Sequence, residues 1–154
     1  MSSEEFEQGR QAWPVLFRSC LILMDRLDRQ LQASVGLQLA WFEVLSQLSS
    51  KPQGMMPMKQ LAESVCLTKS GASRLIDRMV DAKLVERHAC QTDGRVIYAC
   101  VTPQGRLAHE RARSVANQGV DEHFARHLSA TEAKVMSEAL MRVLVAAGCA
   151  QRWS

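Results

Sequence analysis

The sequence contains few aromatic residues: Phe, Trp and Tyr make up 5% of its 154 residues, and it has one tyrosine. Large sheets draw on aromatic and β-branched side chains. Their scarcity beside plentiful Leu, Ala, Val and Met therefore favours helices. With 47% hydrophobic residues, the chain can form one globular domain with a buried core, or a domain with helical extensions. We expect a mainly α protein.

Long apolar runs and a secretion signal are also missing. No stretch approaches the ~20 apolar residues of a membrane span. The acidic start, MSSEEFEQ, lacks the basic and apolar regions of a signal peptide. The five cysteines are odd in number and show no CxxC spacing, which argues against a disulfide framework or a ribbon-type zinc site. We expect a cytoplasmic protein whose cysteines are mostly reduced thiols.

The motifs of common enzyme classes are absent from the sequence. It contains no G-x-S-x-G elbow, P-loop, G-x-G-x-x-G or H-E-x-x-H motif. His123 and His127 lie at i and i+4, but local sequence fixes no carboxylate or cysteine beside them, so a solvated pair is favoured over a metal site. We expect no catalytic residues, no bound metal and no cofactor.

Positive charge is concentrated in the middle of the chain. The net charge is +3, and residues 59–113 carry ten Lys or Arg against six Asp or Glu. The flanking parts are close to neutral, at −1 for residues 1–58 and 0 for residues 114–154. This basic excess is a weak electrostatic sign of nucleic-acid binding.

Hydrophobic periodicity predicts helices on both sides of the basic segment. Apolar residues recur at helical spacing over residues 13–31 and predict one long amphipathic helix. A second helix is predicted over Leu39–Leu48, and the letters SSKPQGMMP mark a loop after it. Two further helices are predicted, from Pro103 to about His127 and from Ala130 to about Ala147, the last opened by the capping-box sequence SATEA.

Two short helices in the basic segment predict a helix-turn-helix. The first runs from Met58 to Val65, and the second follows the letters CLT, with Thr68 as its N-cap. Its predicted buried side holds Leu75, Ile76, Met79 and Val80. The outward face of the second helix mixes hydroxyls with cations, which can donate hydrogen bonds to phosphates and to base edges in a major groove. That face holds Lys69, Ser70, Ser73, Arg74, Asp77 and Arg78. A solvated face without a ligand is the alternative.

The letters CQTDGRVIYACVTPQG, residues 90–105, predict a charged hairpin directly after that helix. Asp93 and Gly94 suit a tight turn between the strands LVERHA and RVIYACV, because Asp-Gly readily takes positive φ angles. Thr102, an N-cap type, predicts that a helix starts right after the second strand. Arg95 at the tip could enter a minor groove or fix phosphates. Asp93 could brace the turn by accepting bonds from turn amides or a nearby arginine, unless both are incidental turn residues.

A helix-turn-helix followed by a hairpin is a winged helix, and the segment from Leu61 to Gly105 resembles the DNA-binding core of the MarR family of bacterial transcription regulators. The resemblance rests on QLAESVCLTKSGASRLIDRMVDAKLVER, on the Asp93-x-Arg95 wing and on VTPQG. Two positions depart from the family. Lys83 stands where glycine usually ends the recognition helix, and Gly94 stands where a bulkier or basic residue is common.

The resemblance implies a fold that is mainly α with a small β-hairpin wing. Residues 1–36 would be an N-terminal dimerisation helix region, residues 37–102 a winged helix-turn-helix core, and residues 103–154 C-terminal dimerisation helices. The apolar sequence VMSEALMRVLVAAGCA supports a dimer, because it is apolar over more than one helical face.

The resemblance also implies a function: a sequence-specific transcription regulator that binds double-stranded DNA as a homodimer. Its operator would be pseudo-palindromic, with half-sites about 34 Å apart, and it would act as a ligand-responsive repressor. The implied DNA-binding residues are Thr68, Lys69, Ser70, Ser73, Arg74, Arg78, Asp93 and Arg95. A small-molecule effector, such as an aromatic acid, could bind a pocket lined by Trp13, Phe17, Trp41 and Phe42, although aromatics at helical spacing are also typical of a core.

Two alternatives remain open. Peroxide-sensing relatives have a reactive cysteine near the start of the first long helix, where Cys20 lies, and Cys149 could be its partner in a thiol-based redox-sensing repressor. Against this, such a cysteine is generally held by tyrosine hydroxyls, and Tyr98 lies in the wing. The position of Cys20 on the apolar stripe also predicts a buried, inert thiol. The other alternative is a winged helix used only for protein contacts.

Overall fold

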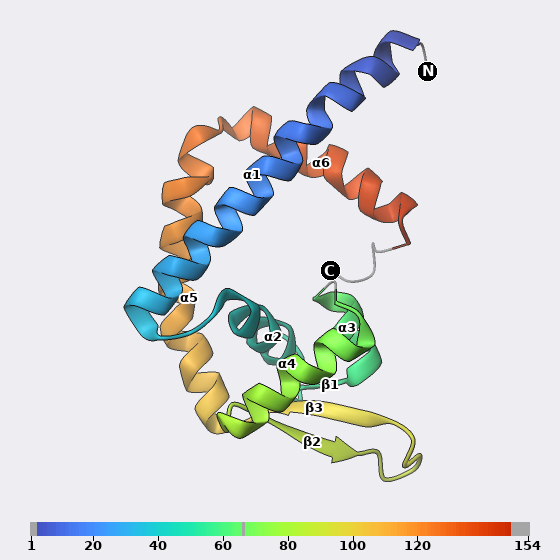
Figure 1. Cartoon of the computed structure of the whole chain (residues 1–154), viewed down its shortest axis with the longest axis vertical. Helices are drawn as coiled ribbons and strands as arrows, with labels where there is room; N and C mark the ends of the chain where they lie inside the picture. Colours follow the sequence, from blue (N-terminus) through green and yellow to red (C-terminus); the bar gives the residue numbers. More distant parts are fainter. Residues whose placement is uncertain (1–2, 66, 149–154) are drawn as a thin grey trace.

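The computed structural model describes residues 3–65 and 67–148 of the chain (Figure 1). Its elements in chain order are α1 (Ser3–Val35), α2 (Leu39–Ser49), β1 (Met55–Pro57), α3 (Met58–Ser64), α4 (Lys69–Asp81), β2 (Val85–Ala89), β3 (Ile97–Val101), α5 (Pro103–His123), the 3-10 helix η1 (Ala125–His127) and α6 (Ala130–Ala146). The prediction of a mainly α fold is confirmed. No helix in this described part is both long and apolar enough to cross a membrane.

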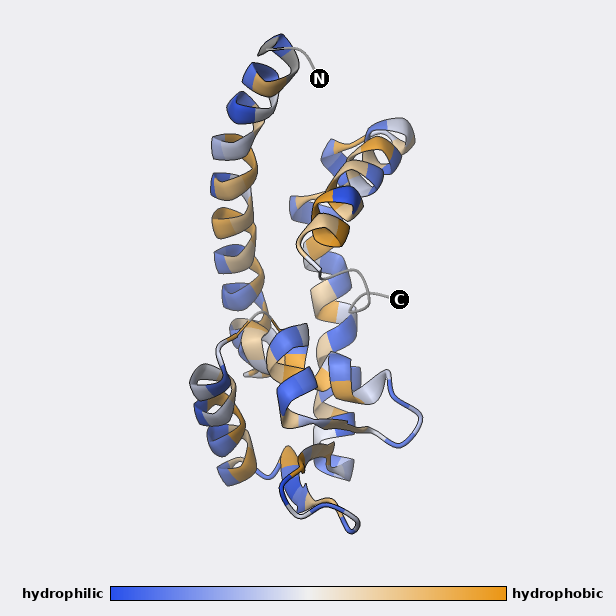
Figure 2. Ribbon diagram, turned by 90° about the vertical axis from the view of Figure 1, so that its right-hand side faces the viewer, coloured by the Kyte–Doolittle hydropathy of each residue, from blue (hydrophilic) through white to orange (hydrophobic). Residues whose placement is uncertain are grey.

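The elements form a compact lobe and an open frame. In Figure 1, α2, α3, α4 and the sheet gather in the lobe, while α1 and α5 lead away from it and pack against each other near the carboxyl end of α1. Small residues on α5 allow this close approach: Ala112, Ala116 and Gly119 are buried, and a Cβ at Gly119 would overlap Leu27 of α1. The frame is completed by α6, which lies apart from the upper part of α1 in the second view (Figure 2).

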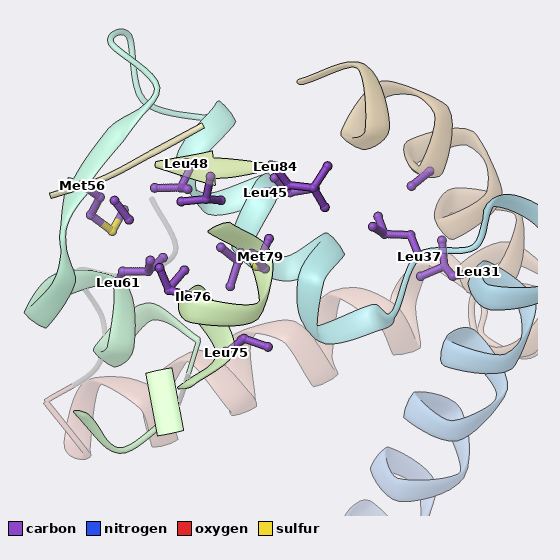
Figure 3. Packing of buried hydrophobic residues seen from close by; sticks show 14 of the residues in the cluster. Leu31, Leu37, Leu45, Leu48, Met56, Leu61, Leu75, Ile76, Met79 and Leu84 are labelled. Atoms are coloured by element: carbon purple, nitrogen blue, oxygen red, sulfur yellow. The ribbon is translucent and has the colours of Figure 1, made fainter. Parts of the chain in front are cut away.

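The hydrophobic core fills the lobe and joins it to the base of the frame (Figure 3). It contains Leu45 and Leu48 of α2, Met56 of β1, Leu61 of α3, and Leu75, Ile76 and Met79 of α4, together with Leu31 and Leu37 near the end of α1. Fully burying each such side chain contributes about 1.5 to 3 kcal/mol. The buried face of α4 predicted from periodicity is thereby confirmed, with Val80 half-buried at its margin.

The sheet has three antiparallel strands in the order β1-β3-β2, so the prediction of a hairpin alone was incomplete. Met55–Pro57, within the letters assigned to a loop, pairs with β3 in a register that sets Met56 opposite Ala99. A three-residue strand shows almost no alternation, and its pairing partner lies more than 40 positions away, so local sequence carries little sign of it. Pro57 is tolerated because β1 is an edge strand.

The predicted N-caps are confirmed, whereas one helix end differs. Thr102 caps α5 by accepting a hydrogen bond from the Gly105 amide, and Ser129 and Glu132 form the predicted capping box of α6. The helix predicted to continue to about residue 127 ends at His123, and η1 follows it. This change of helix type removes the i, i+4 geometry assumed for His123 and His127.

A tight junction at Thr102 links the end of α4, the start of the sheet hairpin and the start of α5. The Thr102 hydroxyl donates to the Lys83 carbonyl at 2.7 Å and accepts from the Gly105 amide at 2.9 Å. The Thr102 amide donates to the Leu84 carbonyl at 3.1 Å. Gly105 permits this approach because a Cβ there would overlap the Leu84 carbonyl oxygen.

Helix α4 ends at a residue with positive φ that is not glycine. Lys83 has φ 60°, its amide donates to the Val80 carbonyl, and the Leu84 amide donates to the Met79 carbonyl. These bonds form a Schellman motif. Lysine thus adopts the backbone conformation that glycine would take here, which costs roughly 1 to 2 kcal/mol relative to a relaxed residue.

Lys83→Gly should therefore stabilise the protein. Removing the Cβ relieves the left-handed strain, while the larger unfolded-state entropy of glycine offsets part of the gain, so we expect about 0.5 to 1 kcal/mol in the free energy of unfolding. Urea denaturation measures this change. Lys83→Ala is the matched control, because it removes the charged side chain and keeps the Cβ. Equal gains in both variants would show that backbone strain is not the cause.

Candidate nucleic-acid interface

The helix α4 presents the predicted contact residues on the face opposite the core. Thr68 begins it by accepting a hydrogen bond from the Gly71 amide at 3.1 Å, which confirms the predicted N-cap. Lys69, Ser70, Arg74 and Arg78 are exposed and Ser73 is half-buried. The core thus holds one side of α4 and leaves the other side free to approach a groove.

A shallow hollow of about 440 Å³ lies beside the start of α4. It is lined by Met58, Lys59, Lys69, Ser70, Ser73, Arg87 and Ile97. Three of these side chains are cationic, and the amino end of a helix also favours negative charge. The hollow therefore offers a positively charged surface next to the exposed face of α4, as phosphate contacts require.

The wing is the β2–β3 hairpin, paired from Val85 opposite Val101 to Ala89 opposite Ile97. Residues 90–96 form its loop. The Asp93 carboxylate accepts a hydrogen bond from the Arg95 amide at 3.0 Å, and the Asp93 carbonyl accepts one from the Val96 amide at 3.0 Å. The carboxylate thus bonds to a turn amide, one of the two partners expected for it. Asp93 and Arg95 are both exposed at the wing tip.

The prediction of a positive φ at Gly94 was wrong. Among the described residues, glycines with positive φ are Gly36, Gly54 and Gly148. The reason is loop length, because the wing loop is longer than the two-residue turns that demand such angles, and the Asp93 side chain closes the turn instead. A Cβ at Gly94 would meet no atom within 4 Å, so the wing has space for the larger residue common in the resembling family.

The cysteines differ from the prediction at one position. Cys20 is exposed on α1 in the single chain, not buried, because nothing within the described chain covers the upper part of the apolar stripe. Tyr98 lies in β3, and Cys149 falls outside the described residues.

In the wing loop, the pKa of the Cys90 thiol is lowered, first by its hydrogen bond with the Thr92 side chain and then by backbone bonds with Thr92 and Asp93.

The four aromatic residues proposed for an effector pocket form two separate groups in this chain. Trp13 and Phe17 are exposed on α1, with ring centroids 5.9 Å apart. Trp41 and Phe42 pack against the core on α2, and Phe42 stacks on His109 at 5.4 Å. Trp13 lies roughly 33 Å before the end of α1, given a rise of about 1.5 Å per residue. One chain therefore does not bring the four side chains together.

Apolar residues recur along the frame, as Figure 2 shows in orange on α1 and α6, and many of their large side chains are exposed. In α1 they are Phe6, Trp13, Val15, Phe17, Leu21, Ile22 and Met24. In α6 they are Val135, Met141, Val143 and Val145, and no residue of α6 is buried in this chain. So many exposed large apolar side chains are typical of protein–protein interaction sites.

Arg87 lies on this candidate interface and was missed by the sequence analysis. It lies on β2, and its Nη2 atom is 3.0 Å from the Ser73 carbonyl oxygen, 3.0 Å from the Ser73 hydroxyl and 3.0 Å from the Asp77 carboxylate. Strand alternation could have placed it, because Arg87 follows the buried Val85 by two positions and shares its face of the sheet. Lys59 was missed because it precedes α4 by ten positions and reaches the hollow through tertiary packing.

Comparison with known proteins agrees with this geometry. Residues 35–96 match the family model described as MarR family. The chain is 28% identical over 99 residues to the HTH-type transcriptional regulator MhqR of Bacillus subtilis (strain 168), an alignment that covers 64% of this chain and 66% of that protein.

Solved structures resemble the fold over nearly the whole chain. Sco3205, a MarR family transcriptional regulator from Streptomyces coelicolor solved in complex with DNA, has 26% identity and a TM-score of 0.82, covering 94% of this chain and 88% of that one. AbsC, a MarR family transcriptional regulator from the same organism, has 27% identity and a TM-score of 0.82, covering 93% of each chain. The winged helix, the match of residues 35–96 to the family model and these relatives agree: the chain is similar to MarR family transcription regulators in its winged-helix core and in its overall fold.

Proposed function

We propose that this protein is a sequence-specific repressor that binds a pseudo-palindromic DNA operator as a homodimer and releases it in response to a small molecule. The observation that carries the proposal is the exposed polar face of α4, which is fastened to the wing strand β2 through Arg87. Hydroxyl and guanidinium donors on that face suit base edges, and the cations beside its amino end suit phosphates. The wing adds Arg95, which can enter the adjacent minor groove or fix phosphates.

A second copy of the chain would cover the exposed apolar faces of the frame. Residues 1–36 and 103–154 form the dimerisation parts in this proposal, because they carry those faces. Burying such surface contributes about 25 cal/mol per Å². A two-fold axis pairs each face with its own copy and sets two α4 helices toward successive major grooves, about 34 Å apart.

An effector pocket lined by Trp13, Phe17, Trp41 and Phe42 requires the dimer, since the single chain separates them into two groups. Trp41 supports a ligand nearby, because its indole nitrogen is buried without a hydrogen-bond partner in the structure of residues 3–65 and 67–148. A small molecule with a hydrogen-bond acceptor and an apolar ring, such as an aromatic acid, would satisfy that group. The resemblance to the family also supports a ligand-responsive repressor in the cytoplasm.

Selection from a duplex library with a randomised central segment tests the proposal. The wild-type protein should enrich inverted repeats whose half-sites lie one helical turn apart. Arg74→Ala should weaken binding to the selected duplex by about 5- to 150-fold and relax its base preference, because an arginine that reaches a base contributes about 1 to 3 kcal/mol. The enrichment of no sequence by the wild-type protein would contradict sequence-specific binding.

Lys69→Ala is the matched variant, since it removes the same charge from the same helix. It should weaken selected and random duplexes alike and lower the slope of log affinity against log salt by about two per dimer, as expected for two lost phosphate contacts. Identical behaviour of the two variants would show that base and phosphate contacts are wrongly assigned.

A further inference from the structure

We infer that Arg87 is a positioning residue that fixes the DNA-facing side of α4 from the wing strand and thereby sets which bases α4 prefers. The inference rests on the proposed function and goes beyond it, because Arg87 would act through Ser73 and Asp77 and not by contacting DNA. One guanidinium nitrogen of Arg87 binds three acceptors on two residues that lie one helical turn apart on α4.

The contacts of Arg87 with Ser73 and Asp77 restrain the position of α4 more than they stabilise the fold. The Arg87 side chain is 34% exposed and the Asp77 side chain 57% exposed, so water screens their ion pair and its contribution to folding is small. The bonds to Ser73 reach both its backbone carbonyl and its hydroxyl. They therefore restrain the backbone of α4 and one of its side chains together, at a point where α4 has a half-buried polar residue.

The first chemical consequence concerns the Ser73 hydroxyl. Its oxygen accepts a hydrogen bond from Arg87, so its own proton remains available for donation. A donor at this point of the helix favours acceptors in the major groove, which are purine N7, guanine O6 and thymine O4, or a phosphate oxygen. Arg87 thereby orients Ser73 as a donor toward the DNA.

The second consequence concerns charge. Asp77 lies on the exposed face of α4, where a free carboxylate would repel phosphates. Its pairing with Arg87 at 3.0 Å offsets that charge locally and holds the carboxylate toward β2. An exposed face that contains an aspartate can therefore approach a polyanion.

A direct phosphate contact is the competing role for Arg87, because it also lines the hollow with Lys59 and Lys69. The two roles differ in their dependence on salt and on side-chain shape. A phosphate contact needs a positive charge, which lysine supplies, and its loss lowers the salt slope. Positioning needs the reach and the planar shape of the guanidinium, which lysine lacks.

The experiment compares Arg87→Lys, Arg87→Ala and the wild-type protein on two probes, the library-selected duplex and a random-sequence duplex of equal length. We expect Arg87→Lys to lose about tenfold in affinity for the selected duplex and to broaden its base preference when selection is repeated. Its affinity for the random duplex should stay within about twofold of the wild-type value, and its salt slope within about half a unit. Arg111→Lys on the exposed side of α5 controls for the exchange itself.

A double-mutant cycle separates positioning from misfolding. Ser73→Ala should cost less affinity in the Arg87→Lys background than in the wild-type background, because the two residues act as one unit. Asp77→Asn keeps an acceptor for Arg87 and should retain the base preference. Thermal unfolding of each variant shows whether the fold is intact.

Three outcomes would overturn the inference. The first is an Arg87→Lys variant with wild-type affinity and base preference, combined with a lowered salt slope in Arg87→Ala, which would assign Arg87 to a phosphate. The second is additivity between Arg87→Lys and Ser73→Ala. The third is the absence of any selected sequence for the wild-type protein, which would overturn the proposed function together with this inference, whereas the first two leave the proposed function in place.

Discussion

Deletion of residues 130–154 should convert the protein to a monomer and lower its affinity for a two-half-site duplex by at least about a hundredfold. The deletion removes α6, whose exposed apolar side chains have no cover among residues 3–65 and 67–148. A dimer joins two DNA-binding lobes, and such coupling raises affinity by about 10² to 10⁴ over a single lobe. Sedimentation analysis gives the mass, and fluorescence anisotropy gives the affinity.

A full-length variant guards this prediction against misfolding of a shortened chain. Val143→Glu places a charge on a side chain that is 63% exposed, so the single chain should tolerate it while the dimer should not. Glu138→Gln, on an exposed position of α6, is the control and should leave the dimer unchanged. On a duplex with one half-site, all variants should bind with similar affinity. A monomeric variant with undiminished affinity for the two-half-site duplex would refute the dimer proposal.

Arg95→Ala should lower DNA affinity by at least about tenfold without changing the fold or the oligomeric state, since the proposed dimer would lose two wing contacts. Asp93→Ala should lower affinity as well, although it removes a negative charge that would lie near DNA in the proposed complex. The Asp93 carboxylate holds the wing loop by accepting a hydrogen bond from the Arg95 amide. Without it the loop gains conformational freedom, and ordering Arg95 on DNA becomes more costly.

Asp93→Asn separates the hydrogen bond accepted by this carboxylate from its negative charge. Asparagine can accept the same hydrogen bond from the Arg95 amide and carries no charge. We therefore expect Asp93→Asn to bind at least as tightly as the wild-type protein and Asp93→Ala to bind more weakly, at the same salt concentration. If Asp93→Ala instead bound more tightly, charge would dominate and the carboxylate would have no bracing role.

The sequence allowed the helices to be predicted where local signals were strong. Hydroxyl residues at Thr68, Thr102 and Ser129 marked three helix starts, and the structure confirms all three caps. Periodicity also identified the buried face of α4, because its apolar residues recur at helical spacing. The strand β1 escaped prediction, since three residues show no period and their pairing with β3 is not local. The φ angle of Gly94 escaped it because a side-chain bond replaced the expected turn.

The residues of the candidate site were likewise predictable only where the local sequence pattern was strong. Helical periodicity placed Lys69, Ser70 and Arg74 on the exposed face of α4, where the structure has them, while their contact with DNA stays a prediction. Arg87 could not be assigned to this surface from spacing along one helix, because it reaches α4 from a strand. Cys20 was predicted to be buried because it lies on the apolar stripe of α1, but it is exposed in the single chain. Helical spacing shows that residues share a face and does not show which segment covers that face.

The hydrogen bonds at Thr102 couple α4 to α5, so a tilt of α5 moves α4 with it. Hydrogen bonds join the carboxyl end of α4 to the first turn of α5. Because Gly105 has no side chain, the two segments pack in direct contact. α5 has 21 residues, which corresponds to about 31 Å at 1.5 Å per residue. A tilt of α5 by about 10° at its far end would then shift α4 by about 5 Å, roughly the spacing of one and a half base pairs. In the proposed dimer, a change of angle among the distant helices would thus move the two α4 helices out of register with the DNA and leave each lobe unaltered.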